Sequence, residues 1–517
     1  MSRARNVINI VNFVRQIDER TDIDLFQATV EEVRAVKAFG FPNTFLLQYD
    51  ALIQPEYQRL FLENRDDSME LGIWLEVVAP LCEATGIPWE SRLGFRWDWH
   101  VKPGFLMAYD QDQRRRLLDE VMEKFKQVFG YYPRTAGSWI IDSFSMDYLA
   151  EAYGMDAFAI CRDQWGTDCY TLWGGYYNQA YYPCRKNMLI PAQTRAEQIP
   201  VPVFRMLGSD PIYQYDDGFT GGYNMADCQA VQTLEPVWPC GADPDWVDWY
   251  LKNNFQTPSL GFAYTQAGQE NSFGWDRIGT PLRMQFEKIK ALWDRGDAVV
   301  ETLGATGQWF QSAYQETPAT AVTFLEDWRS TENQSVWYDC KYYRANLYSD
   351  GNAVWFRDIH LFDENRADRY LSEPCTVDDA VYDALPVMDG YRWSRDALRA
   401  GIYISGAVRI KETREATGGG LSVTAVCGEK APVIVTMTEA GICLEGGPGL
   451  EVRILYSDES RQKSAISALD TTGIDYDYMG WQYRLELEAG RLSGTVIQSE
   501  NGRIIMRMRS TENRKGE

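Results

Sequence analysis

The sequence predicts an α/β barrel of the (β/α)7 type followed by a C-terminal all-β, sandwich-like domain. Three observations predict this fold class. The chain has 517 residues, enough for two to four domains. Its first ~300 residues alternate short apolar runs with longer helical patterns, which is typical of repeated βα units around a parallel sheet or barrel. Beyond residue 335, short apolar runs are separated by Gly, Asp and Ser turns, which is typical of an all-β domain.

Seven strands are predicted in the first part of the chain, with helices between most of them. The clearest helix runs from Asp110 to Phe129, where apolar residues recur at helical spacing before Gly130. A second helix, Met146–Tyr153, stops at Gly154 in the same way. The predicted strands are Val7–Phe13, Thr44–Gln48, Leu71–Val77, Gly137–Ile141, Ala157–Cys161, Val201–Met206 and Gly261–Tyr264.

The character of the sequence changes between residues 300 and 335, after a helical stretch interrupted by glycines. We therefore predict a barrel domain over 1–300, a helical linker over 301–335 and a β-sandwich domain over 336–517. The strands predicted in the last domain are Val354–Ile359, Gly401–Val408, Leu421–Ala425, Val433–Met437, Val452–Leu455, Trp481–Leu487 and Gly494–Gln498.

Charge and cysteine content narrow the partners and the compartment. Asp and Glu (74) exceed Lys and Arg (51), giving a net charge of −23, which repels nucleic acid and anionic membranes. No apolar run is long enough to span a bilayer, and the N-terminus has no secretion signal. The ten cysteines are scattered singly, as in reduced, cytoplasmic proteins. We therefore expect a cytoplasmic protein with neither a nucleic-acid nor a membrane partner.

Histidine and aromatic content bear on the chemistry. Only His100 and His360 are present, so a histidine-rich metal site is excluded. Motifs for a phosphate loop, a dinucleotide fold, a zinc protease and a serine hydrolase are also absent, and we expect no cofactor. Aromatic residues make up 14 %, and their flat faces suit carbohydrate rings as well as interfaces, so a homo-oligomer is compatible with the composition.

Acidic residues follow most of the predicted barrel strands. In parallel barrels the reacting groups collect at the C-terminal ends of the strands. Paired carboxylates flanked by aromatic and amide groups are the chemistry of glycosidic bond cleavage, in which one acid protonates the leaving oxygen and the other attacks or activates water. The residues at these ends are Asp50, Glu76, Asp142, Asp163, Asp210 and Glu270, with Asp98 and His100 between the third and fourth strands.

Two segments carry a resemblance to a known superfamily. The stretch Met69–Glu76, followed by the long helix and then Tyr132–Trp139, resembles the glycoside hydrolase/polysaccharide deacetylase superfamily of seven-stranded barrels across about the first 280 residues. Within it, Trp139-Ile140-Ile141-Asp142 and the helix ending at Gly154 resemble glycoside hydrolase family 57. The resemblance implies a nucleophile at Asp142, a second carboxylate near Glu270 and a trailing β-sandwich.

The sequence also departs from these families. Asn12-Phe13 stands where family 57 carries a histidine, and Asp142 replaces its glutamate. The deacetylases bind metal through an Asp and a His-x-x-x-His pair, whereas here Leu75 stands at the first imidazole position and His100 is followed by Gly104. The absence of the two imidazoles disfavours the metal-dependent deacetylase chemistry of the superfamily.

Three functions follow as hypotheses. The first is a glycoside hydrolase acting on an oligosaccharide or small glycoconjugate, with Asp142 as nucleophile or base, Glu270 as general acid and Asp163 as an alternative for either role. The second is a metal-dependent carbohydrate deacetylase or amidase that uses Asp50, Asp98 and His100 as an oxygen-rich site. The third is a non-catalytic carbohydrate-binding barrel. The substrate-binding residues predicted for the first are Asp50, Glu76, Asp98, His100, Trp165, Asp210, Tyr213 and Gln269.

Overall fold

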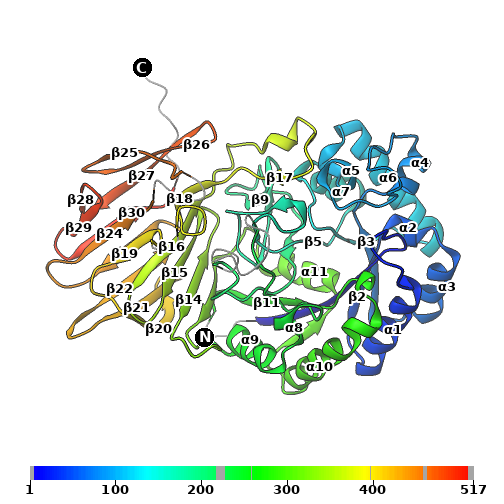
Figure 1. The fold of residues 1–517 in the computed structure, drawn as a ribbon, viewed down its shortest axis with the longest axis horizontal. Coiled ribbons are helices and arrows are strands. Elements are labelled where there is room, and N and C mark those ends of the chain that lie inside the picture. Colours follow the sequence, from blue (N-terminus) through cyan, green and yellow to red (C-terminus); the bar gives the residue numbers. More distant parts are fainter. Residues whose placement is uncertain (1–4, 217–227, 258, 396–397, 458–462, 510–517) are drawn as a thin grey trace.

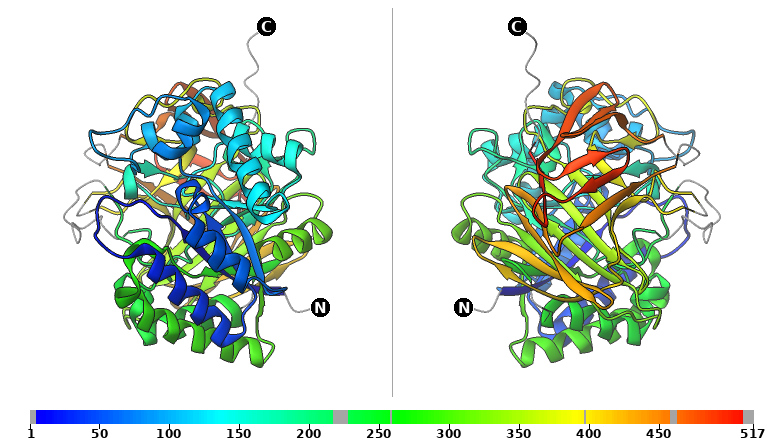
Figure 2. Two further views of the ribbon diagram at one scale, coloured as in Figure 1. Left: turned by 90° about the vertical axis from the view of Figure 1, so that its right-hand side faces the viewer. Right: turned by 90° about the vertical axis from the view of Figure 1, so that its left-hand side faces the viewer.

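The computed structural model describes residues 5–216, 228–257, 259–395, 398–457 and 463–509. It contains a mixed α/β part and an all-β part that lie side by side (Figure 1). The α/β part holds the N-terminal strands and most of the helices, and the all-β part holds the antiparallel strands of the C-terminal region (Figures 1 and 2).

A curled, mostly parallel sheet forms the centre of the α/β part. Its strand order is β11-β1-β2-β3-β4-β5-β10-β7, and β12 pairs with β1. Every pairing among these strands is parallel except that of β7 with β10, and within the described residues no pairing joins β10 to β11. The strands are β1 (Arg5–Val14), β2 (Asn43–Leu47), β3 (Met69–Trp74), β4 (Thr135–Gly137), β5 (Ala157–Ile160), β7 (Ala180–Tyr181), β10 (Val203–Arg205), β11 (Phe262–Ala267) and β12 (Val299–Glu301).

All seven predicted barrel strands therefore correspond to parallel strands. Strand β1 is buried along nearly its whole length, as expected for a parallel strand that is covered on both faces. The fourth strand differs from the prediction because β4 ends at Gly137. Residues 138–141 then leave the sheet and lead to Asp142, which caps the next helix.

The helices of this part lie around the sheet (Figure 1). Helix α6 reproduces the predicted Asp110–Phe129 helix because Asp110 and Gln113 form a capping box and Gly130, at φ 87°, ends it in the left-handed conformation. The helices are α1 (Leu25–Phe39), α2 (Tyr49–Leu52), α3 (Pro55–Asn64), α4 (Ala79–Thr85), α5 (Val101–Gly104), α6 (Gln111–Phe129), α7 (Ser143–Tyr153), α8 (Pro239–Ala242), α9 (Pro244–Gln256), α10 (Trp275–Asp294) and α11 (Leu303–Ala313).

The all-β part consists mainly of two antiparallel sheets. The first runs β13-β14-β15-β16-β19-β24-β29-β28, with β18 also paired to β16, and the second runs β20-β21-β22-β23-β30-β27-β26-β25. Side chains of both sheets, such as Phe356 and Val435, share one hydrophobic core. The predicted all-β character of this region is therefore confirmed.

The first antiparallel sheet begins before the predicted domain. Strand β13 lies at 320–324, within the segment predicted as a helical linker, whereas β12 and α11 at 299–313 contact the parallel sheet. Its strands are β13 (Thr320–Phe324), β14 (Gln334–Asp339), β15 (Tyr343–Ser349), β16 (Val354–Leu361), β18 (Leu385–Asp389), β19 (Gly401–Ile404), β24 (Glu451–Leu455), β28 (Arg491–Ser493) and β29 (Val496–Gln498).

The second sheet is built from consecutive hairpins and the last strands of the chain. Its strands are β20 (Arg409–Ala416), β21 (Gly420–Cys427), β22 (Lys430–Thr438), β23 (Gly441–Glu445), β25 (Ile466–Asp470), β26 (Gly473–Tyr478), β27 (Trp481–Ala489) and β30 (Arg503–Arg507).

A buried ion-pair network joins the two parts. Asp163, just after β5, pairs with Arg344 of β15 at 2.9 Å, and Arg344 also pairs with Asp358 of β16 at 2.9 Å. All three side chains are at most 1 % exposed. The α/β and all-β parts therefore meet through a desolvated charge cluster as well as through apolar contacts.

The segment between β5 and β10 is a long excursion that the strand pattern did not predict. It contributes β6 (Tyr170–Thr171) to a two-stranded sheet with β17 (Ala380–Val381), and it contains the two-stranded sheet of β8 (Pro183–Cys184) and β9 (Asn187–Pro191). The pairing of β6 with β17 brings a loop of the all-β part next to the barrel.

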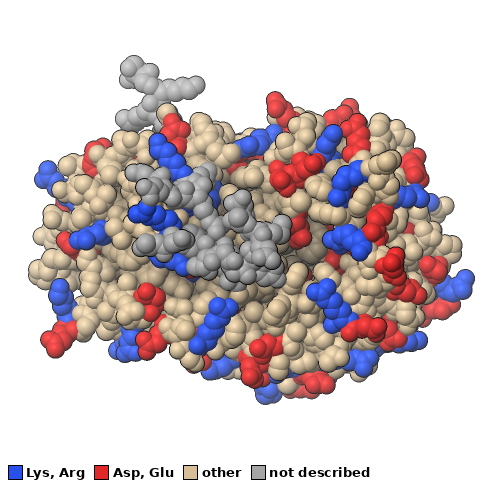
Figure 3. All heavy atoms as spheres, viewed as in Figure 1, with Lys and Arg blue, Asp and Glu red and all other residues tan. Residues whose placement is uncertain are grey.

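None of the helices in the described residues combines the length and the apolar character that crossing a bilayer requires. Acidic and basic side chains are mixed over the face seen in Figure 3.

Candidate active site

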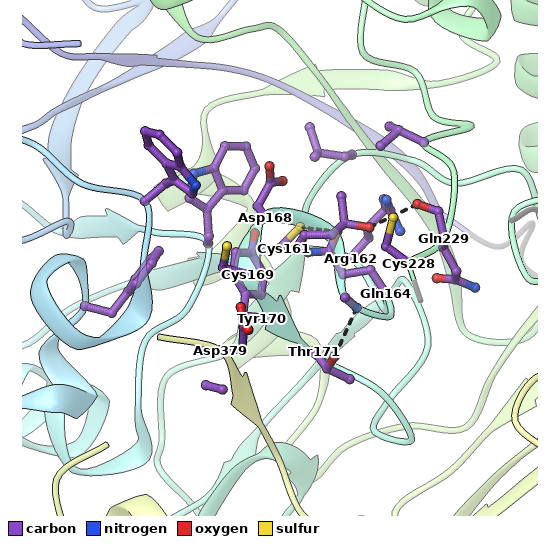
Figure 4. A pocket seen from close by; sticks show the side chains of 18 of the residues that line it. Cys161, Arg162, Gln164, Asp168, Cys169, Tyr170, Thr171, Cys228, Gln229 and Asp379 are labelled. Carbon is purple, nitrogen blue, oxygen red and sulfur yellow. Dashed lines mark hydrogen bonds between the residues drawn. The ribbon is translucent and has the colours of Figure 1, made fainter. Parts of the chain in front are cut away.

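A cavity of about 800 Å³ lies at the C-terminal ends of the parallel strands. Arg15 follows β1, Trp139 follows β4, Arg162 follows β5 and Glu270 follows β11, and all four line it. This is the position at which parallel α/β folds place their reacting groups. Residues 379–381 of the all-β part complete the wall beside the excursion residues 166–171 (Figure 4).

Aromatic side chains make up much of the cavity wall. Trp97 and Trp99 lie in the loop after α4, and their ring centroids are 5.8 Å apart. Flat rings of this kind present faces on which a sugar ring can pack. The aromatic residues of the wall are Trp97, Trp99, Phe105, Trp139, Tyr170, Trp238 and Phe273.

Glu270 is the predicted strand-end carboxylate that lines this cavity. It directly follows the β11 strand end and receives a hydrogen bond of 2.8 Å from Arg15 Nη2 to its Oε2. Arg15 in turn lies 3.4 Å from Glu76 Oε2 and packs 4.3 Å above the ring of Trp97. Burial disfavours the charged form of Arg15, but the charges of Glu270 and Glu76 outweigh this effect and raise the pKa of Arg15 above the ordinary value. The guanidinium therefore stays charged and holds Glu270 in place.

Three further acids line the cavity, namely Asp168, Glu235 and Asp379, which directly precedes β17, and none of them is at the end of a parallel strand. Asp168 lies in the excursion after β5, and Glu235 lies in the loop after β10. Burial, helped by the charges of Asp168 and Glu270, raises the pKa of Glu235 to about 7 against the opposing effects of Arg162 and of the hydrogen bond from Thr233. Desolvation by the surrounding cavity walls and the charge of Glu270 also raise the pKa of Asp168.

The backbone around Asp168 is held in an uncommon conformation. Asp168 (φ 58°) and Cys169 (φ 60°) are consecutive non-glycine residues in the left-handed region. Such residues cluster at functional sites, where the surrounding structure holds them. The turn presents Asp168 to the cavity, and its side chain is exposed there (Figure 4).

Asp142, the predicted nucleophile, does not line this cavity. It is the N-cap of α7, where Oδ1 accepts hydrogen bonds from Ser145 N at 3.0 Å and from Arg114 Nη1 at 2.9 Å. Ser145 Oγ donates to its other oxygen at 2.7 Å. Both oxygens are therefore engaged in capping a helix and in neutralising a buried arginine, and the predicted pairing of Asp142 with Glu270 is not observed.

Asp163, Asp50 and Asp210 are likewise buried away from the cavity. Asp163 belongs to the ion pair with Arg344 described above, and Asp50 accepts hydrogen bonds from the backbone N–H groups of Gln16 and Ile17 at 2.9 and 2.6 Å. Asp210 accepts from the indole N–H of two tryptophans, each at 3.0 Å. Burial raises the pKa of all three carboxyl groups.

Glu76, Asp98 and His100 lie behind the aromatic wall rather than in the cavity lining. Glu76 accepts a hydrogen bond from Trp97 Nε1 at 2.7 Å, and burial raises its pKa. Asp98 Oδ1 lies 2.8 Å from both Arg92 Nη2 and His100 Nδ1. Burial disfavours the charged form of Asp98, but these contacts outweigh that effect and lower the pKa of Asp98 to about 2. The three residues therefore fix the loop that carries Trp97 and Trp99.

The remaining predicted contact residues also lie outside the cavity lining. Trp165 packs edge-on against Trp173, Tyr213 donates its hydroxyl to Asp327 at 2.8 Å, and the Gln269 N–H donates to Asn12 Oδ1 at 3.1 Å. All three positions are explained by packing or by internal hydrogen bonds.

A signal for one missed residue was available in the sequence. Arg162 directly follows the predicted strand 157–161. It was not predicted as a site residue because the strand-end prediction concerned acidic residues only. Asp168 and Glu235 carried no comparable signal because they lie 8 and 30 residues after the ends of β5 and β10, at Ile160 and Arg205.

The residues predicted for a metal site are not grouped in the structure. Among the described residues, no three or more His, Cys, Asp or Glu side chains are grouped so that they could hold a metal ion. Asp50, Asp98 and His100 therefore do not form such a group.

Comparison with known proteins supports the fold. The sequence matches no family model and no curated protein. A protein from Parabacteroides distasonis with a suggested glycoside hydrolase/deacetylase activity has a similar structure, with TM-score 0.53 and 14 % identity over 75 % of this chain and 90 % of the other. The resemblance predicted from the sequence is thus confirmed at the level of the fold.

Two other solved structures match less well. A suggested polysaccharide deacetylase from Mycobacterium smegmatis has TM-score 0.37 at 13 % identity, over 60 % of this chain and 91 % of the other. A GH57 branching enzyme from Thermococcus kodakaraensis has TM-score 0.30 at 9 % identity, over 60 % of this chain and 71 % of the other. Neither of these two matches supports a fold or a function for this chain.

Proposed function

We propose that this chain is a glycoside hydrolase and that Glu270 and Glu235 are its catalytic carboxyl groups. The observation that carries the proposal is an aromatic-walled cavity at the strand ends that holds two glutamates in unlike environments. Glycosidases need one carboxyl group that is protonated and one that is ionised at the same pH. The fold shared with a suggested glycoside hydrolase/deacetylase supports a carbohydrate substrate by analogy only.

Glu235 takes the role of general acid in this proposal. Its pKa of about 7 keeps a large fraction protonated at neutral pH, and Thr233 Oγ1 donates a hydrogen bond of 3.0 Å to Oε2. A general acid is most effective when its pKa lies near the working pH. Glu235 then protonates the glycosidic oxygen as the bond to the anomeric carbon breaks.

Glu270 takes the role of nucleophile or base. Its Oε2 accepts a hydrogen bond of 2.8 Å from the charged Arg15, and that bond fixes the oxygen in direction. The carboxylate then attacks the anomeric carbon or removes a proton from the attacking water. Asp168, exposed in the same cavity, is placed to accept hydrogen bonds from sugar hydroxyl groups.

Single substitutions with a panel of aryl glycosides test the assignment. Glu270→Gln and Glu235→Gln remove the carboxyl function with little change in shape, and each should lower kcat by at least roughly 100-fold. Glu63→Gln, the same substitution at an exposed position of α3, serves as a folding and handling control. Turnover of acetylated sugars without turnover of any glycoside would replace the proposal with a deacetylase. Full activity of both Gln variants would refute the carboxyl pair.

A further inference from the structure

Three arginines line the cavity, and two of them are neutralised by carboxylates of the protein. Arg15 pairs with Glu270 and Glu76, and Arg20 donates from Nε and Nη2 to Asp18 at 2.9 and 2.6 Å. Both guanidinium groups are therefore committed to internal ion pairs.

Arg162 differs from these two. It is 1 % exposed, yet no described carboxylate forms an ion pair with it. Its one hydrogen bond runs from Nη1 to the backbone carbonyl of Asp163 at 3.1 Å, and its buried Nε has no partner among the described residues. In Figure 4, no dashed line joins Arg162 to Asp168.

A buried charge without a partner is costly, and proteins retain one where a ligand supplies the counter-charge. Asp168 and Glu235 are near enough for Arg162 to lower the pKa of each, but neither forms an ion pair with it. The guanidinium group is a planar fork that matches a carboxylate, and it remains charged at any working pH.

Resting on the proposed function, we infer that the substrate carries a carboxylate and that Arg162 binds it, so that the sugar in the cavity is a uronic acid. One unpaired guanidinium balances one negative charge. A group with two charges, such as a phosphate ester, would be repelled more strongly by Glu270, Asp168, Glu235 and Asp379, which line the same cavity.

Binding of matched ligands tests the site without requiring turnover. Oligosaccharides of glucuronic and galacturonic acid are compared with their methyl esters, which keep the ring and remove the charge, by calorimetry on the wild-type chain. The acid of one of the two sugars should bind roughly ten- to a hundredfold more tightly than its ester, as expected for hydrogen bonds to a charged group.

Variants then locate the effect. Arg162→Met should bring the ratio of acid to ester affinity close to one, and Arg162→Lys should give an intermediate ratio because the charge remains but the fork is lost. Arg115→Met, an exposed arginine of α6 outside the cavity lining, is the matched control and should keep the wild-type ratio.

The outcomes separate this inference from the proposed function. Turnover of neutral aryl glycosides together with equal affinity for acids and esters would overturn the inference and leave the function standing. Tight, Arg162-dependent binding of the acid without turnover of any glycoside would support the carboxylate-binding site but overturn the proposed glycoside hydrolase function. Preference for a sulfated neutral sugar over both uronic acids would overturn the assignment of the carboxylate.

Discussion

Arg15 Nη2 lies 2.8 Å from Glu270 Oε2, and both side chains are almost fully buried, at 1 % and 5 % exposed. The two residues come from the ends of β1 and β11, which are neighbours in the parallel sheet although 255 residues separate them in the chain. The pair therefore couples the position of the proposed catalytic carboxylate to the pairing of β1 with β11.

Loss of the Arg15 charge should affect both folding and activity. Arg15→Met leaves Glu270 and Glu76 buried without their cation, and removing one partner of a buried ion pair costs about 3–5 kcal/mol. We expect a free energy of unfolding lower by that order and a kcat lower by at least roughly tenfold. Urea denaturation and steady-state kinetics measure the two effects.

The control for this substitution is Arg115→Met. Arg115 forms an exposed pair with Asp112 at 2.9 Å, and such pairs contribute less than ~1 kcal/mol. A folded Arg15→Met variant with wild-type stability and wild-type kcat would contradict the role given to this arginine.

The pH profile should report Glu235. Because a general acid works only in its protonated form, and because the pKa of Glu235 is about 7, kcat/KM should be level below that pH and fall about tenfold per unit well above it. In Glu235→Gln, the residual activity on substrates with good leaving groups should lose this alkaline limb. An unchanged limb in the variant would assign the ionisation to another group.

Asp142 should prove structural. Asp142→Ala removes the cap of α7, which costs about 1 kcal/mol, and leaves Arg114 buried without its ion pair, which costs about 3–5 kcal/mol. Asp142→Asn keeps the capping oxygen, so its free energy of unfolding should lie between those of Asp142→Ala and the wild type. The kcat of the folded Asn variant should stay within several-fold of the wild type. A loss of several orders of magnitude at unchanged stability would instead make Asp142 catalytic.

Asp368 should make the protein less stable at alkaline pH. Burial, helped by the charge of Asp383, raises its pKa to about 8 against the opposing hydrogen bond from Tyr370 N at 3.0 Å. In the unfolded chain the pKa of an aspartate is about 3.9. The folded state therefore binds the proton more tightly, so the stability it contributes is complete below about pH 4 and is lost as the pH rises to about 8.

Asp368→Asn should remove this dependence. Between pH 5 and pH 9 the melting temperature of the variant should fall less than that of the wild type. Asp112→Asn, whose side chain is 90 % exposed, is the control and should follow the wild type. Parallel curves for Asp368→Asn and the wild type would show that Asp368 does not retain its proton in the folded state.

Much of the fold could be predicted because its information is local. Strands β1 and β2 are mainly apolar, β5 is a continuous apolar run, and α6 carries its own capping box and terminal glycine. The excursion between β5 and β10 escaped prediction because its strands have two to five residues and are stabilised by contacts with distant segments, such as β17.

The candidate site could be predicted only where it follows the strand-end rule. Glu270 was found because it comes soon after a long apolar strand. Asp142 met a similar rule, but an aspartate before a helix can also be the helix cap, and here its oxygens bind Ser145 and Arg114. The sequence pattern does not distinguish a catalytic aspartate from one that caps a helix.

The sequence by itself determined the parallel and antiparallel parts, most of the barrel strands and one cavity carboxylate, because hydrophobic periodicity and capping are encoded by near neighbours. Only the tertiary structure decided that Glu235 and Asp168 share a cavity with Glu270, that Asp142 is engaged elsewhere, and that Arg162 is buried without an ion pair to any described carboxylate. These properties depend on burial and on distances between residues far apart in the chain, and they exist only once the sheet has curled and the loops have packed over its end.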